Sequence, residues 1–215
     1  GDEIKNTMAT FEEMYENKGG IANGLTTGFA DLDNLTSGLH NAELIILAAR
    51  PSMGKTALSC AIMEHVSLEL KKAVLYFSIE MSKENLVQRL VCSLAKVSPS
   101  EVKKGFLSEA GWEKLTVAAA KLSNSNIFID DTPGITAMQM KNKARRLKAQ
   151  DKVDLIIVDY LQLMECHKKS ENRQQEISEI SRALKSIARE LNVPLLSLSQ
   201  LSRAVESRQD KRPLL

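Results

Sequence analysis

The chain has 215 residues, a length typical of one folded domain, so we expect a single hydrophobic core. Hydrophobic residues make up 43% of the sequence and charged residues 26%, which is close to globular averages and excludes disorder as the main state. The 29 basic and 27 acidic residues give a net charge of +2, so no overall basic field points to nucleic acid.

Two further features bear on the compartment. The longest purely aliphatic stretch, LIILAA at 44–49, is far short of the ~20 residues that span a bilayer. The three cysteines are widely spaced and form no CxxC pair, which is unlike a disulfide framework or a zinc site. We therefore expect a soluble cytoplasmic protein with no membrane partner. The chain begins at Gly1 without a signal segment or an initiator methionine, so we interpret it as a piece of a longer protein.

The first predicted element is an amphipathic helix within residues 1–20. Its apolar residues recur at about 3.6 residues and are Ile4, Met8, Phe11 and Tyr15. A glycine pair at 19–20 then ends the pattern. A helix of this kind buries its apolar face either on its own domain or in a groove of a neighbouring subunit, and the pattern alone leaves both open.

From residue 21 onward, short aliphatic runs alternate with longer stretches of helical period. The predicted strands are 44–49, 74–79, 127–130, 155–159 and 195–199. The predicted helices are Lys55–Leu70, Lys83–Ala95, Glu109–Leu122, Ala137–Ala149 and Asn172–Leu191. A capping-box pair, Thr136 and Gln139, marks one helix start. The alternation predicts an α/β fold with a mostly parallel sheet flanked by helices, and the apolar stripe of the last helix should face the core.

The strand at 44–49 leads directly into ARPSMGKT and then a helix, which is the context of a phosphate-binding P-loop. The residues expected around a nucleotide's phosphates are Ala49, Arg50, Pro51, Ser52, Met53, Gly54, Lys55 and Thr56. Lys55 is expected to reach the β and γ phosphates, and Thr56 to supply a magnesium ligand. The first motif position is usually glycine, so either Ala49 has an ordinary φ here or the match is accidental.

Three more polar residues end predicted strands. Asp159 follows LIIV and could hold magnesium through water. Glu80, in FSIEM, could deprotonate an attacking water. Gln200, at the end of LLSLSQ, could sense the γ phosphate. Since parallel strands end at one edge of a sheet, we expect all three beside the P-loop.

Four motifs occur in a distinctive order: ARPSMGKT, FSIEMS, VDYLQLM and LSQLSR. With them, residues 21–215 resemble the RecA-like motor domain of the DnaB-type replicative DNA helicases. The resemblance implies a P-loop ATPase domain that uses ATP and Mg²⁺. It implies catalytic roles for Lys55, Glu80 and Gln200, and magnesium binding by Thr56 and Asp159. It also implies that Arg89 contacts the nucleotide, although spacing alone favours a solvated helix arginine.

The resemblance further implies the assembly and its partners. Residues 2–18 look like a linker helix that docks on the adjacent motor domain of a homo-hexamer at the replication fork. Single-stranded DNA, primase and a helicase loader are the implied partners of the full-length protein. The family's trans-acting basic finger follows the segment resembling 208–215, so the ATPase domain is expected to be incomplete at its C-terminus and weakly active alone.

The loop at 165–173 carries basic residues that either are merely solvated or line a DNA channel. The candidates for DNA contact are Lys168, Lys169 and Arg173. Two other functions stay open beside the helicase: a recombinase-like ATPase, and a nucleotide-dependent docking module without motor activity.

Overall fold

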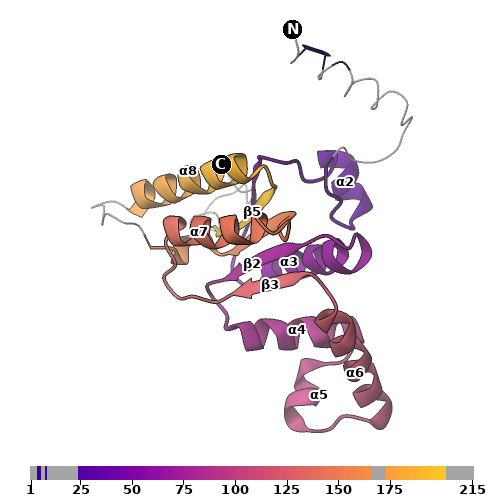
Figure 1. The fold of residues 1–215 in the computed structure, drawn as a ribbon. Helices are drawn as coiled ribbons and strands as arrows, with labels where there is room; N and C mark the ends of the chain where they lie inside the picture. The colour runs from indigo at the N-terminus through magenta and orange to yellow at the C-terminus, as the bar shows by residue number, and fades with distance from the viewer. Residues whose placement is uncertain (1–3, 6–7, 9–23, 166–172, 202–215) are drawn as a thin grey trace, which may run out of the picture.

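The computed structural model describes residues 4–5, 8, 24–165 and 173–201 (Figure 1). In this part of the chain five strands form one sheet in the order β1-β5-β4-β2-β3, and every neighbouring pair is parallel. The strands are β1 (Leu44–Ala49), β2 (Val74–Ser78), β3 (Ile127–Asp130), β4 (Leu155–Asp159) and β5 (Leu195–Gln200). The predicted parallel sheet is confirmed, and its carboxyl ends share one edge.

The strands form because they are rich in aliphatic and aromatic residues, which favour extended backbone and can be buried on both faces in the middle of the sheet. All five residues of β2 and all five of β4 are buried. Successive residues alternate between two cores: Leu75 and Phe77 enter one, while Val74 and Tyr76 enter the other. The sheet is thus the middle layer of a three-layer domain.

Helices cover both faces of the sheet (Figure 1). Residues of α7 (Ala137–Lys148) and α8 (Arg173–Leu191) pack into one core. Residues of α3 (Lys55–Glu64) and α4 (Lys83–Ala95) pack into the other. A smaller cluster joins α4 to α5 (Pro99–Lys104) and α6 (Glu109–Ser123), which lie beyond α4 on the side away from the sheet.

Two helix predictions are confirmed in detail. Thr136 and Gln139 form the predicted capping box at the start of α7, with both reciprocal hydrogen bonds present. The apolar stripe of α8 faces the core as predicted, with Ile180, Leu184 and Ile187 buried and Ile177 packed against them.

The structure also differs from the predicted elements. It adds the short helices α2 (Ala30–Thr36), α5 and η2 (Leu161–Leu163). The helix predicted over 55–70 changes after Glu64 into the π-helix η1 (His65–Glu69). Strand β2 stops at Ser78, one residue before its predicted end. The backbone N–H groups of Ile79 and Glu80 both donate to the carbonyl of Asp159, the last residue of β4.

Most of the predicted linker helix lies outside the described residues. Ile4, Lys5 and Met8 are described, and all three are helical. The side chains of Ile4 and Met8 are 70% and 51% exposed. Among the described helices, none combines the length and apolar character of a membrane span.

Candidate nucleotide-binding site

The loop between β1 and α3 has the backbone geometry that phosphate binding requires. Ser52 has a φ of 63° and Gly54 a φ of 90°, and Gly54 is the N-cap of α3. These left-handed conformations curl the loop so that it leads into the positive end of a helix. Ala49 is the last residue of β1 and pairs with Gln200 in ordinary strand conformation. The structure therefore favours the first of the two interpretations of Ala49, since no glycine is needed there.

Lys55, the first residue of α3, lies back across this loop. Its Nζ donates hydrogen bonds to the carbonyl oxygens of Ala49 (3.2 Å) and Arg50 (3.3 Å). The positive charge is thus held over the loop at the carboxyl edge of the sheet. Such a fixed cation, beside the first turn of a helix, favours an anion in the adjoining space.

Asp159 and Thr56 meet below the loop although they are distant in sequence. Thr56 Oγ1 donates to Asp159 Oδ2 at 2.8 Å. Asp159 is only 2% exposed, and its other oxygen, Oδ1, is buried with no hydrogen-bond partner. A buried carboxylate oxygen normally has a hydrogen-bond or metal partner. Hydroxyl and carboxylate oxygens side by side are ligands that suit Mg²⁺. The residues present therefore fit a magnesium ion.

Two buried residues that the sequence analysis missed complete this network. The hydroxyl of Tyr76, from β2, donates to Asp159 Oδ2 at 3.1 Å and shares a 3.0 Å hydrogen bond with Ser59 of α3. Burial raises the pKa of Tyr76 well above its ordinary value, and the charge of Asp159 raises it further. Tyr76 therefore stays neutral and remains a donor. A lone tyrosine within an apolar strand was a usable signal, because a buried hydroxyl needs a partner.

Glu80 lies on the segment between β2 and α4, and its side chain is exposed at the same edge. Its backbone N–H and that of Ile79 donate to Asp159 O at 3.3 Å and 2.8 Å. The carboxylate that could act as a base is therefore anchored through its backbone to the end of β4. This arrangement brings together the two strand-end acids that the sequence predicted.

Arg89 reaches the site from the second turn of α4 and lines the pocket. Its charge also acts on the neighbouring helix: burial raises the pKa of the Cys60 thiol to about 12, and Arg89 opposes that rise. Arg89 is exposed, as spacing alone favoured, and it also lines the pocket, so a contact with the nucleotide stays a prediction.

Gln200, at the end of β5, is tied to the turn that follows β4. Its backbone N–H donates to Gln162 Oε1 at 3.3 Å, and Gln162 Nε2 donates to Gln200 O at 3.2 Å. Gln162 Nε2 also donates to Ser199 Oγ at 2.9 Å. The sequence analysis did not single out Gln162, and the register of β4 beside β5 is what brings it here.

These groups surround one pocket of about 350 Å³ at the carboxyl edge of the sheet. Its lining consists of Pro51, Ser52, Gly54, Lys55, Thr56, Ala57, Glu80, Met81, Arg89, Tyr160 and Gln200. Four predicted nucleotide-site residues are not in this lining. Asp159 is hydrogen bonded to Thr56, and Met53 is 73% exposed. Ala49 and Arg50 contact the site through their carbonyls, which accept from Lys55. The pocket can accept a phosphorylated ligand and a cation together.

The predicted DNA-contacting residues are not placed with the site. Lys168 and Lys169 lie outside the described residues. Arg173 is described only as the first residue of α8. Among the described residues, no group of three or more histidines, cysteines and acids forms a metal centre.

Comparisons with known proteins show the family of this chain. A family model described as the DnaB-like helicase C-terminal domain matches residues 24–215. The replicative DNA helicase DnaC of Bacillus subtilis is 48% identical over 215 residues, which are 100% of this chain and 47% of that protein. DnaB of Geobacillus stearothermophilus is 48% identical over 94% of this chain and 45% of its own length. The chain thus spans about half the length of these curated relatives.

Solved structures give the same answer. One solved ATPase domain superimposes with a TM-score of 0.91 and 38% identity, covering 99% of this chain and 76% of that one. A DnaB-like replicative helicase, solved in a study of its interactions with primase, superimposes with a TM-score of 0.88 and 38% identity. The match covers 98% of this chain and 51% of that one. The predicted RecA-like α/β fold is confirmed. The chain belongs to the family of DnaB-like helicase C-terminal domains.

Proposed function

We propose that this chain is the ATP-driven motor domain of a replicative DNA helicase. In the proposal, ATP hydrolysis at the interfaces of a hexamer moves the ring along single-stranded DNA and separates the duplex. The observation that carries it is the 2.8 Å hydrogen bond between Thr56 of the P-loop and Asp159 at the end of β4, next to an unpartnered carboxylate oxygen. This is the pairing of hydroxyl and acid that holds magnesium in P-loop ATPases.

In the proposed site, the loop from Ala49 to Gly54 surrounds the phosphates with backbone N–H groups. Lys55 replaces its hydrogen bonds to the loop carbonyls with hydrogen bonds to phosphate oxygens. These bonds are stronger because the phosphate acceptors are charged. Thr56 and Asp159 would hold Mg²⁺, whose role is to offset phosphate charge. Arg89 adds a further cation at the pocket wall.

Glu80 is the proposed general base. Its exposed carboxylate lines the pocket and could accept the proton of a water that attacks the γ phosphate. Gln200 is proposed to respond to that phosphate, and its hydrogen bonds to Gln162 link it to the turn after β4. A change at the phosphate could therefore reach the segment that precedes the loop at 165–173.

The proposed partners are single-stranded DNA, further copies of the chain, primase and a helicase loader. Exposed apolar side chains at Ile4 and Met8 support docking of the linker helix, residues 2–18, on a neighbouring subunit. The similarity to a helicase solved in a study of primase interactions supports primase as a partner of the full-length protein. Lys168, Lys169 and Arg173 are proposed to contact the DNA backbone, without preference for base sequence.

Substitution of Lys55 tests this function. In the full-length protein, Lys55→Ala should abolish unwinding of forked DNA and reduce ATP hydrolysis by at least about a hundredfold, since a phosphate-binding cation is lost. Lys148→Ala, on α7 and away from the pocket lining, is the matched lysine control and should unwind normally. Normal unwinding by Lys55→Ala would exclude the motor assignment.

A further inference from the structure

The turn that follows β3 contacts the segment that carries Glu80. A carboxylate oxygen of Asp131 accepts a hydrogen bond from the backbone N–H of Lys83 at 2.9 Å. Lys83 is the first residue of α4 and stands three residues after Glu80. The first N–H groups of a helix have no partner within the helix. Ser82, the N-cap of α4, accepts from the Asn85 N–H. Asp131 accepts from the Lys83 N–H, so the start of α4 is tied to the turn after β3.

Backbone contacts hold the Glu80 segment on its other side. The N–H groups of Ile79 and Glu80 donate to the carbonyl of Asp159, at the end of β4. Within the segment, Ser78 Oγ donates to the carbonyl of Met81 at 2.7 Å. Asp131 supplies the contact on the opposite side, from the turn that follows β3. Glu80 is thus held between two strand ends, and its position depends on both.

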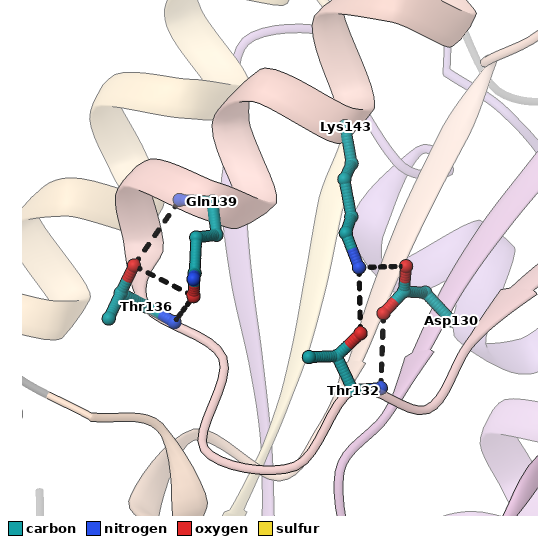
Figure 2. A network of polar contacts seen from close by, with 5 residues as sticks. All are labelled: Asp130, Thr132, Thr136, Gln139 and Lys143. Atoms are coloured by element: carbon teal, nitrogen blue, oxygen red, sulfur yellow. Dashed lines mark hydrogen bonds and ion pairs between the residues drawn. The ribbon is translucent and has the colours of Figure 1, made fainter.

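Asp131 is itself held firmly, because its two neighbours are fixed to α7 by Lys143 (Figure 2). Lys143 Nζ donates to Asp130 Oδ2 at 2.5 Å and to Thr132 Oγ1 at 2.7 Å. The backbone N–H of Thr132 donates to Asp130 Oδ1 at 3.1 Å. Asp131 therefore lies on a turn with restricted freedom. The Thr136–Gln139 capping box, also shown in Figure 2, stabilises the first turn of α7, the helix that carries Lys143.

Burial would raise the pKa of Asp130, but its hydrogen bonds to Lys143 and Thr132 outweigh that effect and lower it. The Asp130 carboxylate is therefore charged at neutral pH and paired with Lys143. The pair is only partly exposed, with 38% of the lysine side chain and 21% of the aspartate side chain accessible. A partly buried ion pair with a second acceptor keeps the turn in one geometry better than an exposed pair does.

We propose that Asp131 is a positioning residue for ATP hydrolysis, and that the Lys143-anchored turn of residues 130–132 sets the position of Glu80 through the start of α4. The proposal rests on the proposed role of Glu80 as the general base. Asp131 does not line the pocket, so it acts on the reaction only through the Glu80 segment. Loss of such supporting contacts lowers activity by roughly 10–100-fold in other sites.

The first test compares Asp131→Ala with Asp131→Asn in the full-length protein. The alanine variant should lower kcat for DNA-stimulated ATP hydrolysis by roughly tenfold or more, with ATP affinity changed less than about twofold. The asparagine variant keeps an acceptor for the Lys83 N–H and should recover at least half of the wild-type kcat. Equal losses in both variants, or a loss of ATP affinity matching the loss of kcat, would contradict the proposal.

A double-mutant cycle separates positioning from general stability. If Asp131 acts through the Glu80 carboxylate, Asp131→Ala should cause no further loss in the Glu80→Gln background, where that carboxylate is absent. Independent, multiplicative losses would refute the positioning role. A Glu80→Gln protein that still turns over normally would instead refute the catalytic role of Glu80, so the two failures can be told apart.

Lys143→Met tests the anchor without touching Asp131. It should lower kcat in the same direction by roughly threefold to tenfold, again with ATP affinity retained. Arg146→Met removes a cationic side chain from the exposed side of the same helix and is the matched control. Wild-type kcat in Lys143→Met, or an equal loss in Arg146→Met, would overturn the assignment of the turn as the anchor.

Discussion

The hydroxyl of Tyr76 joins the P-loop helix to Asp159, so its removal tests the buried network directly. Tyr76 is fully buried, and Tyr76→Phe deletes two hydrogen bonds, to Ser59 at 3.0 Å and to Asp159 at 3.1 Å. Both former partners keep another contact: Asp159 still accepts from Thr56, and the single proton of Ser59, shared in the wild type between Tyr76 and the Thr56 carbonyl, goes to that carbonyl alone. Neither side chain is left fully unpaired, so we expect a loss of about 2 kcal/mol in the free energy of unfolding, the middle of the range for a charged acceptor.

Urea unfolding followed by circular dichroism measures this change, and thermal unfolding should show a fall of roughly 4–8 °C for a domain of this size. Because Asp159 loses one of the groups that orient it, about tenfold more Mg²⁺ should be needed for nucleotide binding. Thr116→Val removes an exposed hydroxyl that bonds within α6 and should change stability by less than about 0.5 kcal/mol. Wild-type stability and Mg²⁺ dependence in Tyr76→Phe would refute the role given to this hydroxyl.

Three further predictions concern the loop, the core and the ion pair. Gly54→Ala places a side chain at a φ of 90°, which is strained although no atom lies within 4 Å, so ATP affinity in a binding titration should fall at least about tenfold. Leu184→Ala opens a cavity at a fully buried position of α8 and should cost about 2–5 kcal/mol in urea unfolding. The folded pKa of Asp130 is depressed, so its pairing with Lys143 stabilises the protein above the pKa of the unfolded carboxyl and is lost as pH falls through the folded value. The stability gap between wild type and Lys143→Met should therefore be constant from about pH 7 to 5 and shrink below about pH 4; a gap that widens on acidification would contradict this.

Much of the fold follows from local pattern in this sequence. Continuous aliphatic runs predicted each of the five observed strands, because a parallel strand is buried on both faces and tolerates few polar residues. The P-loop and the strand-end acids were also predictable, since parallel strands bring their carboxyl ends together. The short helices α2 and α5, of seven and six residues, are too brief to show a helical period and were missed.

The supporting parts of the site were not predictable for a different reason. Tyr76, Ser59 and Asp131 meet partners that lie far apart from them in the chain. A tyrosine in an apolar strand signals that its hydroxyl needs a partner, but no local spacing shows which partner it will meet. Arg89 shows the same limit: spacing favoured an exposed position, which is correct, but only the packing of α4 beside α3 shows that this position lies at the pocket. Side chains that work directly on a phosphate follow a motif, whereas those that orient them depend on the tertiary arrangement.

We propose above all that the pocket at the carboxyl edge of the sheet hydrolyses ATP in response to DNA. The most direct test is ATP turnover by the full-length protein with and without single-stranded DNA, for wild type and for Glu80→Gln, with ATP binding measured in parallel. The account predicts that DNA stimulates wild-type turnover, and that Glu80→Gln binds ATP normally while losing at least about a hundredfold in turnover at any DNA concentration. Wild-type protein that binds ATP but never responds to DNA, or a Glu80→Gln variant with undiminished turnover, would contradict it.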